Sequence, residues 1–119
     1  MGGALFLYMT SGTYTLTNIT FSNNKAYSSG RWNSYTASMR SRGGAVYVNT
    51  GGLVTSSRIN YVNNWAYLAN GNSQSYAVGG GFYRSAGTSA FKSCNFTGNV
   101  VSGARVSEPV PESSLAYRL

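Results

Sequence analysis

The sequence lacks most of the side chains on which catalysis and metal binding depend. Its 119 residues include no His and no Asp, and the only acids are Glu108 and Glu112, close together near the C-terminus. General acid–base catalysis, nucleophile activation and metal binding all draw on these residue types. With no paired carboxylates in the body of the chain, we expect a protein that is not an enzyme and that holds no metal and no cofactor.

Cysteine is almost absent as well, since Cys94 stands alone. A single thiol forms neither an intrachain disulfide nor a Cys-x-x-Cys metal site. A nucleophilic cysteine also needs a nearby base, and the chain has no histidine to serve as one. The sequence therefore predicts that Cys94 is a small, buried, apolar side chain.

Long apolar runs and charge clusters are missing too. No stretch approaches the roughly 20 apolar residues of a membrane span, so we expect no transmembrane segment. The N-terminus does not read as a signal peptide, so a secreted protein with this sequence would be a mature form or an incomplete gene product. The net charge of +7 comes from scattered Lys and Arg. We do not expect nucleic acid as a partner, because the sequence has no run of Lys or Arg and no helical motif of the kind that reads bases.

Three copies of one motif organise the chain. Each copy starts with a Gly-Gly pair and ends at a corner containing Asn, and the copies occupy residues 2–26, 43–66 and 79–101. The separations are 22, 21 and 20 residues for Gly2 to Asn24, Gly43 to Asn64 and Gly79 to Asn99. This near-constant spacing indicates one structural unit repeated three times.

The local patterns within each copy favour strands. Apolar residues alternate, which is the β period, and Gly and Asn recur at fixed positions where they suit tight corners. The segments between copies, residues 27–42 and 67–78, are polar and lack apolar periodicity, so we expect irregular loops there. The sequence predicts an all-β fold, a parallel β-helix or solenoid of about three rungs.

Equivalent residues of successive rungs stack at about 4.8 Å in such a fold. One expected inward column is Ile19, Ile59 and Cys94, and its neighbour is Phe21, Tyr61 and Phe96. A third column, of Asn24, Asn64 and Asn99, is expected to form an Asn ladder in which the side-chain amides hydrogen-bond along the axis.

The combined motif resembles a known repeat. Gly-Gly-Ala followed by an apolar residue and Tyr, and then aromatic-x-Asn-Asn-x-Ala, as in residues 43–47 and 61–66, is similar to the GGA(I/L/V) and FxxN repeats of the chlamydial polymorphic outer membrane proteins. The resemblance covers residues 2–101, with Gly98 as a departure in the last corner. Because members of that family are surface-exposed adhesins, it implies a right-handed parallel β-helix at the cell surface or outside the cell.

Two sets of residues are candidates for the surface. Asn18 and Asn95 each start an Asn-x-Thr pattern and are expected to face solvent, so they are candidate N-glycosylation sites. Leu5, Val46 and Phe82 are expected to face the core, which turns Phe6, Tyr47 and Tyr83 into an exposed aromatic ladder suited to stacking against sugar. The alternative is that this aromatic column faces inward with its hydroxyls at a corner.

The ends of the stack predict a partner. Three rungs present unpaired strand edges and a cross-section of the core, which proteins normally cover. The chain divides into the β-helix repeats of residues 1–102 and an extended, Pro-containing segment of residues 103–119. That segment is either a frayed tail or an inter-subunit arm formed by Pro109, Pro111, Leu115, Tyr117 and Leu119.

These observations favour a non-catalytic structural subunit that stacks end to end into an extracellular filament or sheath, with itself as partner. The alternative is an adhesin or glycan-binding fragment of a larger surface β-helix protein, with glycans bound or attached. A third reading, part of a carbohydrate-cleaving enzyme of the pectate lyase architecture, is disfavoured because such sites use acidic groups and often calcium.

Overall fold

The computed structural model describes residues 3–29, 40–69 and 76–103, and within them the chain forms twelve strands and no helix. We call these three ranges the first, second and third rungs. The strands of the first rung are β1 (Leu5–Met9), β2 (Thr13–Thr17), β3 (Thr20–Ser22) and β4 (Lys25–Ser29). Those of the second are β5 (Arg40–Arg42), β6 (Val46–Ser57), β7 (Asn60–Val62) and β8 (Trp65–Ala69). Those of the third are β9 (Tyr76–Val78), β10 (Phe82–Lys92), β11 (Asn95–Thr97) and β12 (Val100–Gly103).

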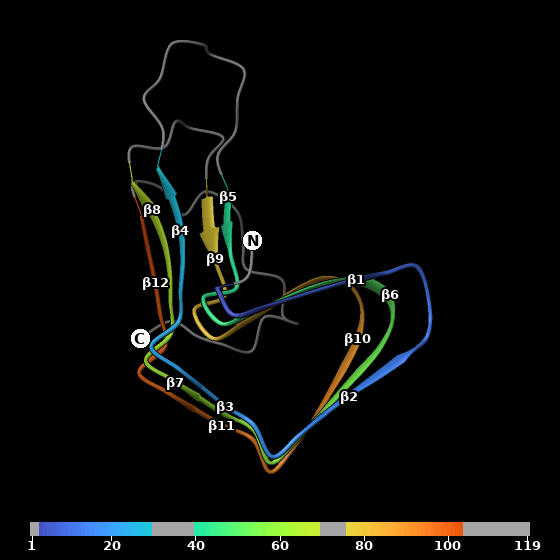
Figure 1. Ribbon diagram of the computed structural model, residues 1–119. Helices are drawn as coiled ribbons and strands as arrows, with labels where there is room; N and C mark the ends of the chain where they lie inside the picture. The colour runs from blue at the N-terminus through green and yellow to red at the C-terminus, as the bar shows by residue number, and fades with distance from the viewer. Residues whose placement is uncertain (1–2, 30–39, 70–75, 104–119) are drawn as a thin grey trace.

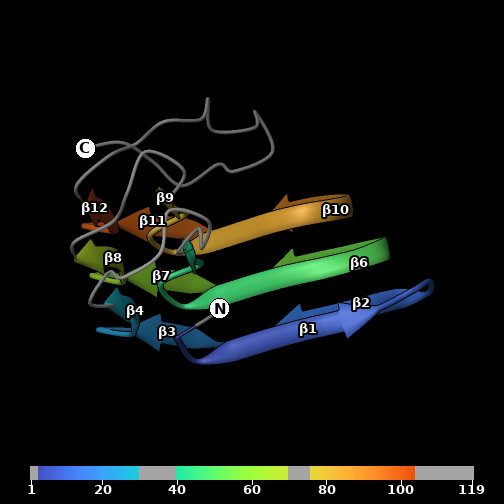
Figure 2. The same ribbon diagram turned by 90° about the horizontal axis from the view of Figure 1, so that it is seen from above.

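Every strand pair among these residues is parallel and joins one rung to the next. The orders are β1–β6–β10 with β2 also on β6, β3–β7–β11, β4–β8–β12 and β5–β9. Figure 2 shows the rungs as three layers, with β6 of the second rung between β1 and β10. The predicted all-β, parallel-strand architecture is thus confirmed.

The corners follow from residues that accept a left-handed backbone. Asn23, Asn63 and Gly98 have φ of 56°, 52° and 61° at equivalent places after β3, β7 and β11. Asn adopts this conformation more readily than most residues, and Gly adopts it without a steric penalty. At another corner, a Cβ on Gly44 would overlap the Gly80 carbonyl oxygen of the next rung. The Gly-Gly motif therefore permits the close approach of successive rungs.

The main core lies between the curled β1/β2–β6–β10 sheet and the β3–β7–β11 sheet (Figure 1). Its aromatic column is stacked, with ring centroids 5.4 Å apart for Phe21 and Tyr61 and 4.5 Å apart for Tyr61 and Phe96. Val46 and Phe82 are buried, as predicted, and Leu5 packs against the same cluster while only half-buried.

Burial is greatest in the second rung. Val48, Val54 and Ile59 are fully buried there, whereas first-rung residues such as Leu16 and Ile19 are only half-buried. The difference arises because a middle rung is covered on both sides and an outer rung on one. Each outer rung therefore leaves part of its apolar surface uncovered.

Cys94 lies in the third rung, so described strands cover it on one side only. It lies in the column of Ile19 and Ile59, since the residues that follow these three positions are register partners. Its thiol donates to the Ser56 carbonyl oxygen at 3.3 Å, but the side chain is only half-buried. The prediction of full burial is wrong because the third rung has no described strand beyond it.

A second, thinner layer extends from the core. The β4–β8–β12 sheet packs beside the β5–β9 pair (Figure 1), and small side chains fill the space between them. Ala66 and Ala77 are fully buried there, and the buried Ser41 hydroxyl donates to the Ala26 carbonyl oxygen at 2.5 Å. Segments that the sequence had suggested to be irregular loops thus contribute β5 and β9.

The predicted C-terminal arm from residue 103 lies outside the described residues except for Gly103, which ends β12. Its functional candidates, Pro109, Pro111, Leu115, Tyr117 and Leu119, all lie outside the described residues.

Tyr61 provides a test of the core through pH. Burial raises its pKa from 10.0 to about 12, with a weak bond to Ser56 acting in the opposite direction. Because the folded-state pKa is raised, the neutral phenol favours folding; this contribution is complete below about pH 10 and is lost as the pH rises toward 12. The Tyr61→Phe variant has no hydroxyl to ionise at this position, and its ring matches those of Phe21 and Phe96 in the same column. Between pH 10 and pH 12 we therefore expect the wild type to lose roughly 2 to 3 kcal/mol more unfolding free energy than the variant.

The measurement is urea unfolding of the wild type and Tyr61→Phe at neutral pH and at pH values between 10 and 12. Equal slopes of stability against pH for the two proteins would show that Tyr61 is not buried as described.

Candidate functional surfaces

The three Asn residues of the predicted column are linked by hydrogen bonds from rung to rung. Asn24 Nδ2 donates to Asn64 Oδ1 at 2.9 Å, and Asn64 Nδ2 donates to Asn99 Oδ1 at 2.8 Å. Asn64 Oδ1 also accepts from the Asn24 backbone N–H, and Asn99 Oδ1 accepts from the Asn64 backbone N–H, each at 3.0 Å. The spacing of the sequence motif thus predicted a ladder that is present, with Asn64 and Asn99 buried.

The ladder also holds the rungs through backbone carbonyls. Asn64 Nδ2 donates to the Phe21 carbonyl oxygen at 2.9 Å, and Asn99 Nδ2 donates to that of Tyr61 at 2.8 Å. Both amide hydrogens and the oxygen of Asn64 are therefore paired. A fully paired buried amide stabilises one alignment of the rungs and penalises every other alignment.

The ladder is directional. At each step the lower-numbered Asn offers its backbone N–H and Nδ2, and the higher-numbered Asn accepts with Oδ1. Among the described residues nothing donates to Asn24 Oδ1, and nothing accepts from the Asn99 backbone N–H. The first-rung end therefore presents an acceptor and the third-rung end presents donors.

Both ends of the described stack also present strands that lack a partner on one side. In the described part of the chain, β1 to β4 pair only with the second rung, and β10 to β12 do so from the other side. An unpaired edge offers backbone N–H and C=O groups to a further strand. The two ends thus have different side chains but the same backbone requirement.

Arg84 distinguishes the third-rung end. It shares a register with Val48, which also pairs with Leu7, so the column is Leu7, Val48 and Arg84. By strand alternation Arg84 lies on the same side of β10 as Phe82, which faces the core. Its Nη1 is buried and has no hydrogen-bond partner in the described chain. A guanidinium thus occupies a place that is aliphatic in the two other rungs.

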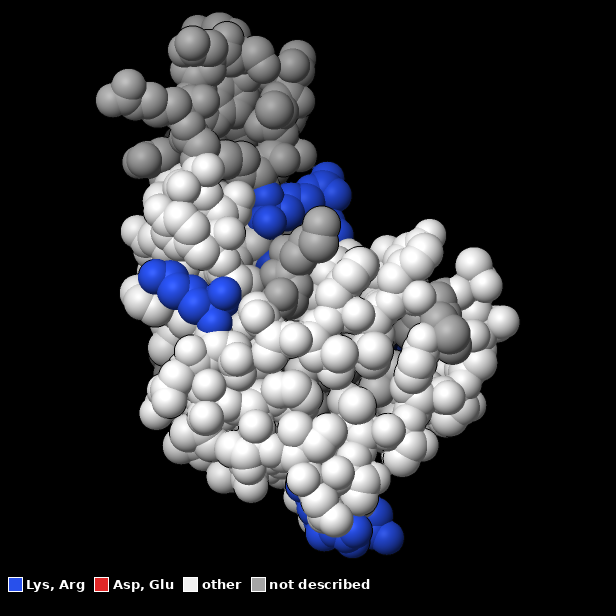
Figure 3. Space-filling model, in the orientation of Figure 1, with Lys and Arg blue, Asp and Glu red and all other residues white. Residues whose placement is uncertain are grey.

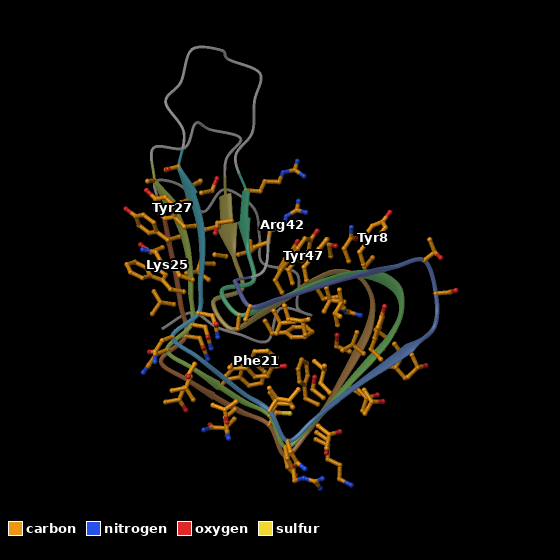
Figure 4. All side chains as sticks on the ribbon, viewed as in Figure 1. Tyr8, Phe21, Lys25, Tyr27, Arg42 and Tyr47 are labelled. Carbon is orange, nitrogen blue, oxygen red and sulfur yellow. The ribbon has the colours of Figure 1, made fainter. Side chains whose placement is uncertain are left out.

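The predicted aromatic ladder forms but is largely covered. Phe6 stacks on Tyr47 with ring centroids 5.0 Å apart, and Tyr47 lies 5.6 Å from Tyr83. Phe6 is 43% exposed, but Tyr47 and Tyr83 are only 5% and 7% exposed, so the prediction of an exposed ladder is wrong for these two. The cause is the β5–β9 pair: Val78 packs against both tyrosines, and Arg42 Nη1 donates to the Tyr47 hydroxyl at 2.7 Å (Figure 4).

A different group of rings is exposed on the β4–β8–β12 sheet. Tyr27 stacks on Tyr67 with centroids 5.5 Å apart, and Trp65 lies 5.1 Å from Tyr67. Lys25 Nζ lies 4.3 Å from the Trp65 ring centroid, 5.0 Å from that of Tyr67 and 5.1 Å from that of Tyr27. We call these four residues the aromatic face.

Reasoning from the sequence missed the aromatic face, although a signal was present. Lys25-x-Tyr27 and Trp65-x-Tyr67 both follow the Asn-Asn corner directly. Continuing the strand alternation past that corner would have aligned Lys25 with Trp65 and Tyr27 with Tyr67, as the register has them. The polar composition of the segment from residue 27 onward concealed this continuation.

The two candidate glycosylation residues are both exposed, as predicted. Asn18 has a φ of 55° and its Oδ1 accepts from Arg58 Nε at 2.5 Å. Asn95 Oδ1 accepts from the Thr97 hydroxyl at 3.2 Å. Their side-chain amides are thus at the surface, each with one polar neighbour.

The described ranges contain no group of three or more His, Cys, Asp or Glu that could hold a metal ion. They also contain no helix long and apolar enough to cross a membrane. No protein-family model, curated protein or solved structure matches the chain.

Asn64 tests the ladder. Asn64→Ala leaves the Asn24 backbone N–H and the Phe21 carbonyl oxygen without their partners, so we expect a loss of about 3 kcal/mol in unfolding free energy. The control is Asn60→Ala in the same rung, where the exposed amide makes one long bond of 3.4 Å to Thr20; its expected loss is roughly 0.5 kcal/mol or less. Chemical denaturation of both variants measures the difference, and equal losses would contradict a stabilising ladder.

Proposed function

We propose that the chain is a right-handed parallel β-helix that serves as a non-catalytic structural subunit, stacking end to end into an extracellular filament or sheath. The three parallel layers support the β-helix, and parallel crossover connections are right-handed in nearly all proteins. The single observation that carries the stacking is the direction of the Asn ladder, with an unmet acceptor at Asn24 and unmet donors at Asn99.

A head-to-tail contact between two copies would pair the unmet donors of one with the unmet acceptor of the other. If the third rung of one copy meets the first rung of the next, the Asn99 backbone N–H and Nδ2 face Asn24 Oδ1 in the geometry of the internal steps. Two identical ends would instead oppose donor to donor or acceptor to acceptor. A head-to-tail contact is heterologous, so it propagates into a filament unless rotation closes it into a ring.

The apolar columns continue through such a junction. Phe96 would stack on the neighbour's Phe21, as Phe96 and Phe21 already stack on the two faces of Tyr61. The half-buried Cys94 and Ile19 would cover one another. The junction would also pair the strand edges of the two copies, so that their backbone N–H and C=O groups would gain hydrogen-bond partners.

Arg84 opposes unlimited growth. In the junction it would face the neighbour's Leu7, which places a guanidinium in an aliphatic column. An inward-pointing charge on an edge strand weakens edge-to-edge association, and burying it without an anion is costly. We therefore propose a junction weaker than the contact between internal rungs, so that assembly is reversible and depends on concentration.

The second candidate is an adhesin or glycan-binding part of a larger β-helix protein at the cell surface. The resemblance to the repeats of polymorphic outer membrane proteins supports it, and so does the exposed aromatic face. In that case further rungs of the same protein would continue the ends. Exposed Asn18 and Asn95 remain candidates for attached glycans under either proposal.

Two substitutions should shift assembly in opposite directions. Ile19→Lys puts a charge on the half-buried core side of the first rung and should abolish filaments. Arg84→Val completes the column of Leu7 and Val48 and should lower the concentration at which filaments appear. Asn60→Lys, at the exposed neighbour of Ile59 in the middle rung, is the matched control away from both ends and should leave assembly unchanged.

Negative-stain electron microscopy and sedimentation velocity provide the readout, with circular dichroism as a check on folding. If the wild type and Arg84→Val both stay monomeric at their highest soluble concentrations, end-to-end assembly is wrong.

A further inference from the structure

The aromatic face lies on the side of the stack, because its side chains project out of the β4–β8–β12 sheet and not along the direction of stacking. Its residues belong to β4 and β8, which pair in parallel with Lys25 opposite Trp65 and Tyr27 opposite Tyr67. Figure 4 shows Lys25 and Tyr27 projecting from the outer side of the β4 strand, away from the labelled core residue Phe21. The residue between them, Ala26, faces the opposite side and is buried. This surface would stay open in a filament as well as in a single copy.

The rings are more exposed than structural stability requires. Tyr27 is 56% and Trp65 is 37% exposed, and the neighbouring Val100 of β12 is 38% exposed. Aromatic rings placed side by side offer flat apolar faces of about the size of a sugar ring, and their polar atoms remain available for hydrogen bonds. Exposed aromatic groups of this kind mark binding sites more often than folding requirements.

Lys25 gives the face a single positive charge. Its ammonium lies within 5.1 Å of three ring centroids, so its position is restricted by cation–π contacts. No carboxylate balances it in the described chain, because the two acids of the sequence are Glu108 and Glu112. Figure 3 shows a separate basic patch where Figure 4 labels Lys25. A held cation without an acidic partner complements an anion.

We propose that the aromatic face binds an acidic glycan, with sugar rings stacking on Tyr27 and Trp65 and a sugar carboxylate accepting from Lys25 Nζ. Stacking selects for a ring with an apolar face, and the ammonium selects for a negative charge beside that ring. Since the face is lateral, the inference does not depend on end-to-end assembly. A filament would repeat the site and raise the avidity for a long polysaccharide.

The charge count favours a glycan over a nucleic acid. Single-stranded nucleic acids bind where stacking rings accompany a positively charged groove that follows many phosphates. Here one lysine accompanies three rings, and the outward residues next to them are uncharged, namely Ser29, Ala69, Val100 and Ser102. One ammonium matches a single sugar carboxylate, whereas these neutral neighbours form no positively charged groove of the kind that follows a phosphate backbone.

Titration calorimetry with a soluble polygalacturonate oligomer and its neutral methyl ester tests the proposal. We expect the acidic oligomer to bind about tenfold more tightly than the ester, and Lys25→Gln to remove that difference. Trp65→Ala should weaken binding of both by about tenfold or more through lost stacking. The matched controls are Tyr8→Ala, an exposed ring on β1, and Lys92→Gln, an exposed cation on β10; both should bind as the wild type does.

Three results would overturn the inference. The first is an absence of binding to the acidic oligomer by the folded wild type. The second is an equal loss of affinity in the control variants. The third is that the wild type binds an oligothymidylate more tightly than the glycan and that Trp65→Ala abolishes this binding. That result would assign the face to nucleic acid. Circular dichroism of each variant separates loss of binding from loss of fold, and the Ile19→Lys protein repeats the titration without filaments.

Discussion

A buried side-chain amide is stable only when its donors and its acceptor are all paired, and Asn64, between Asn24 and Asn99 in the amide column, meets this condition in one alignment of the rungs. A shift by one residue would move every apolar side chain of a strand to the other face and break the amide column together with it. Hydrophobic columns tolerate exchange of one aliphatic residue for another, whereas the amide column does not. The remaining features of the stack depend on the register that these three residues set.

From that register follows the contrast between the middle and the outer rungs. The second rung buries Val48, Val54 and Ile59 completely because strands cover it on both sides, and the outer rungs leave equivalent positions half-buried. The stack of parallel strands therefore has two unequal ends and one repeated lateral surface. Among the described residues the ends present strand edges without a partner strand, with Arg84 in the aliphatic column of the third rung, while the lateral surface carries the exposed rings and Lys25.

Sequence periodicity was sufficient for the parts of the fold that repeat in each rung. The strand pattern, the corners at Asn23 and Asn63 and the ladder of Asn24, Asn64 and Asn99 all follow from spacing, because each rung imposes the same local requirement. The β5–β9 pair was not predictable, since its covering of Tyr47 and Tyr83 depends on contacts between segments without apolar periodicity. Arg84 was also missed, although the predicted columns already imply its register with Leu7 and Val48, because a charged side chain is not expected in an aliphatic column.

End-to-end stacking is the central functional claim, and a designed intermolecular disulfide tests it most directly. Thr20 and Asn95 both pair with Asn60, so within one chain they are two rungs apart, about 9.6 Å at the ordinary strand spacing and too far for a disulfide. A head-to-tail junction would make them neighbours. With Cys94→Val removing the native thiol, mild oxidation of Thr20→Cys/Asn95→Cys should give a ladder of covalent oligomers on a non-reducing gel, whereas Asn95→Cys alone should give nothing beyond dimers. A double variant that stays monomeric, or that stops at dimers, would contradict the account.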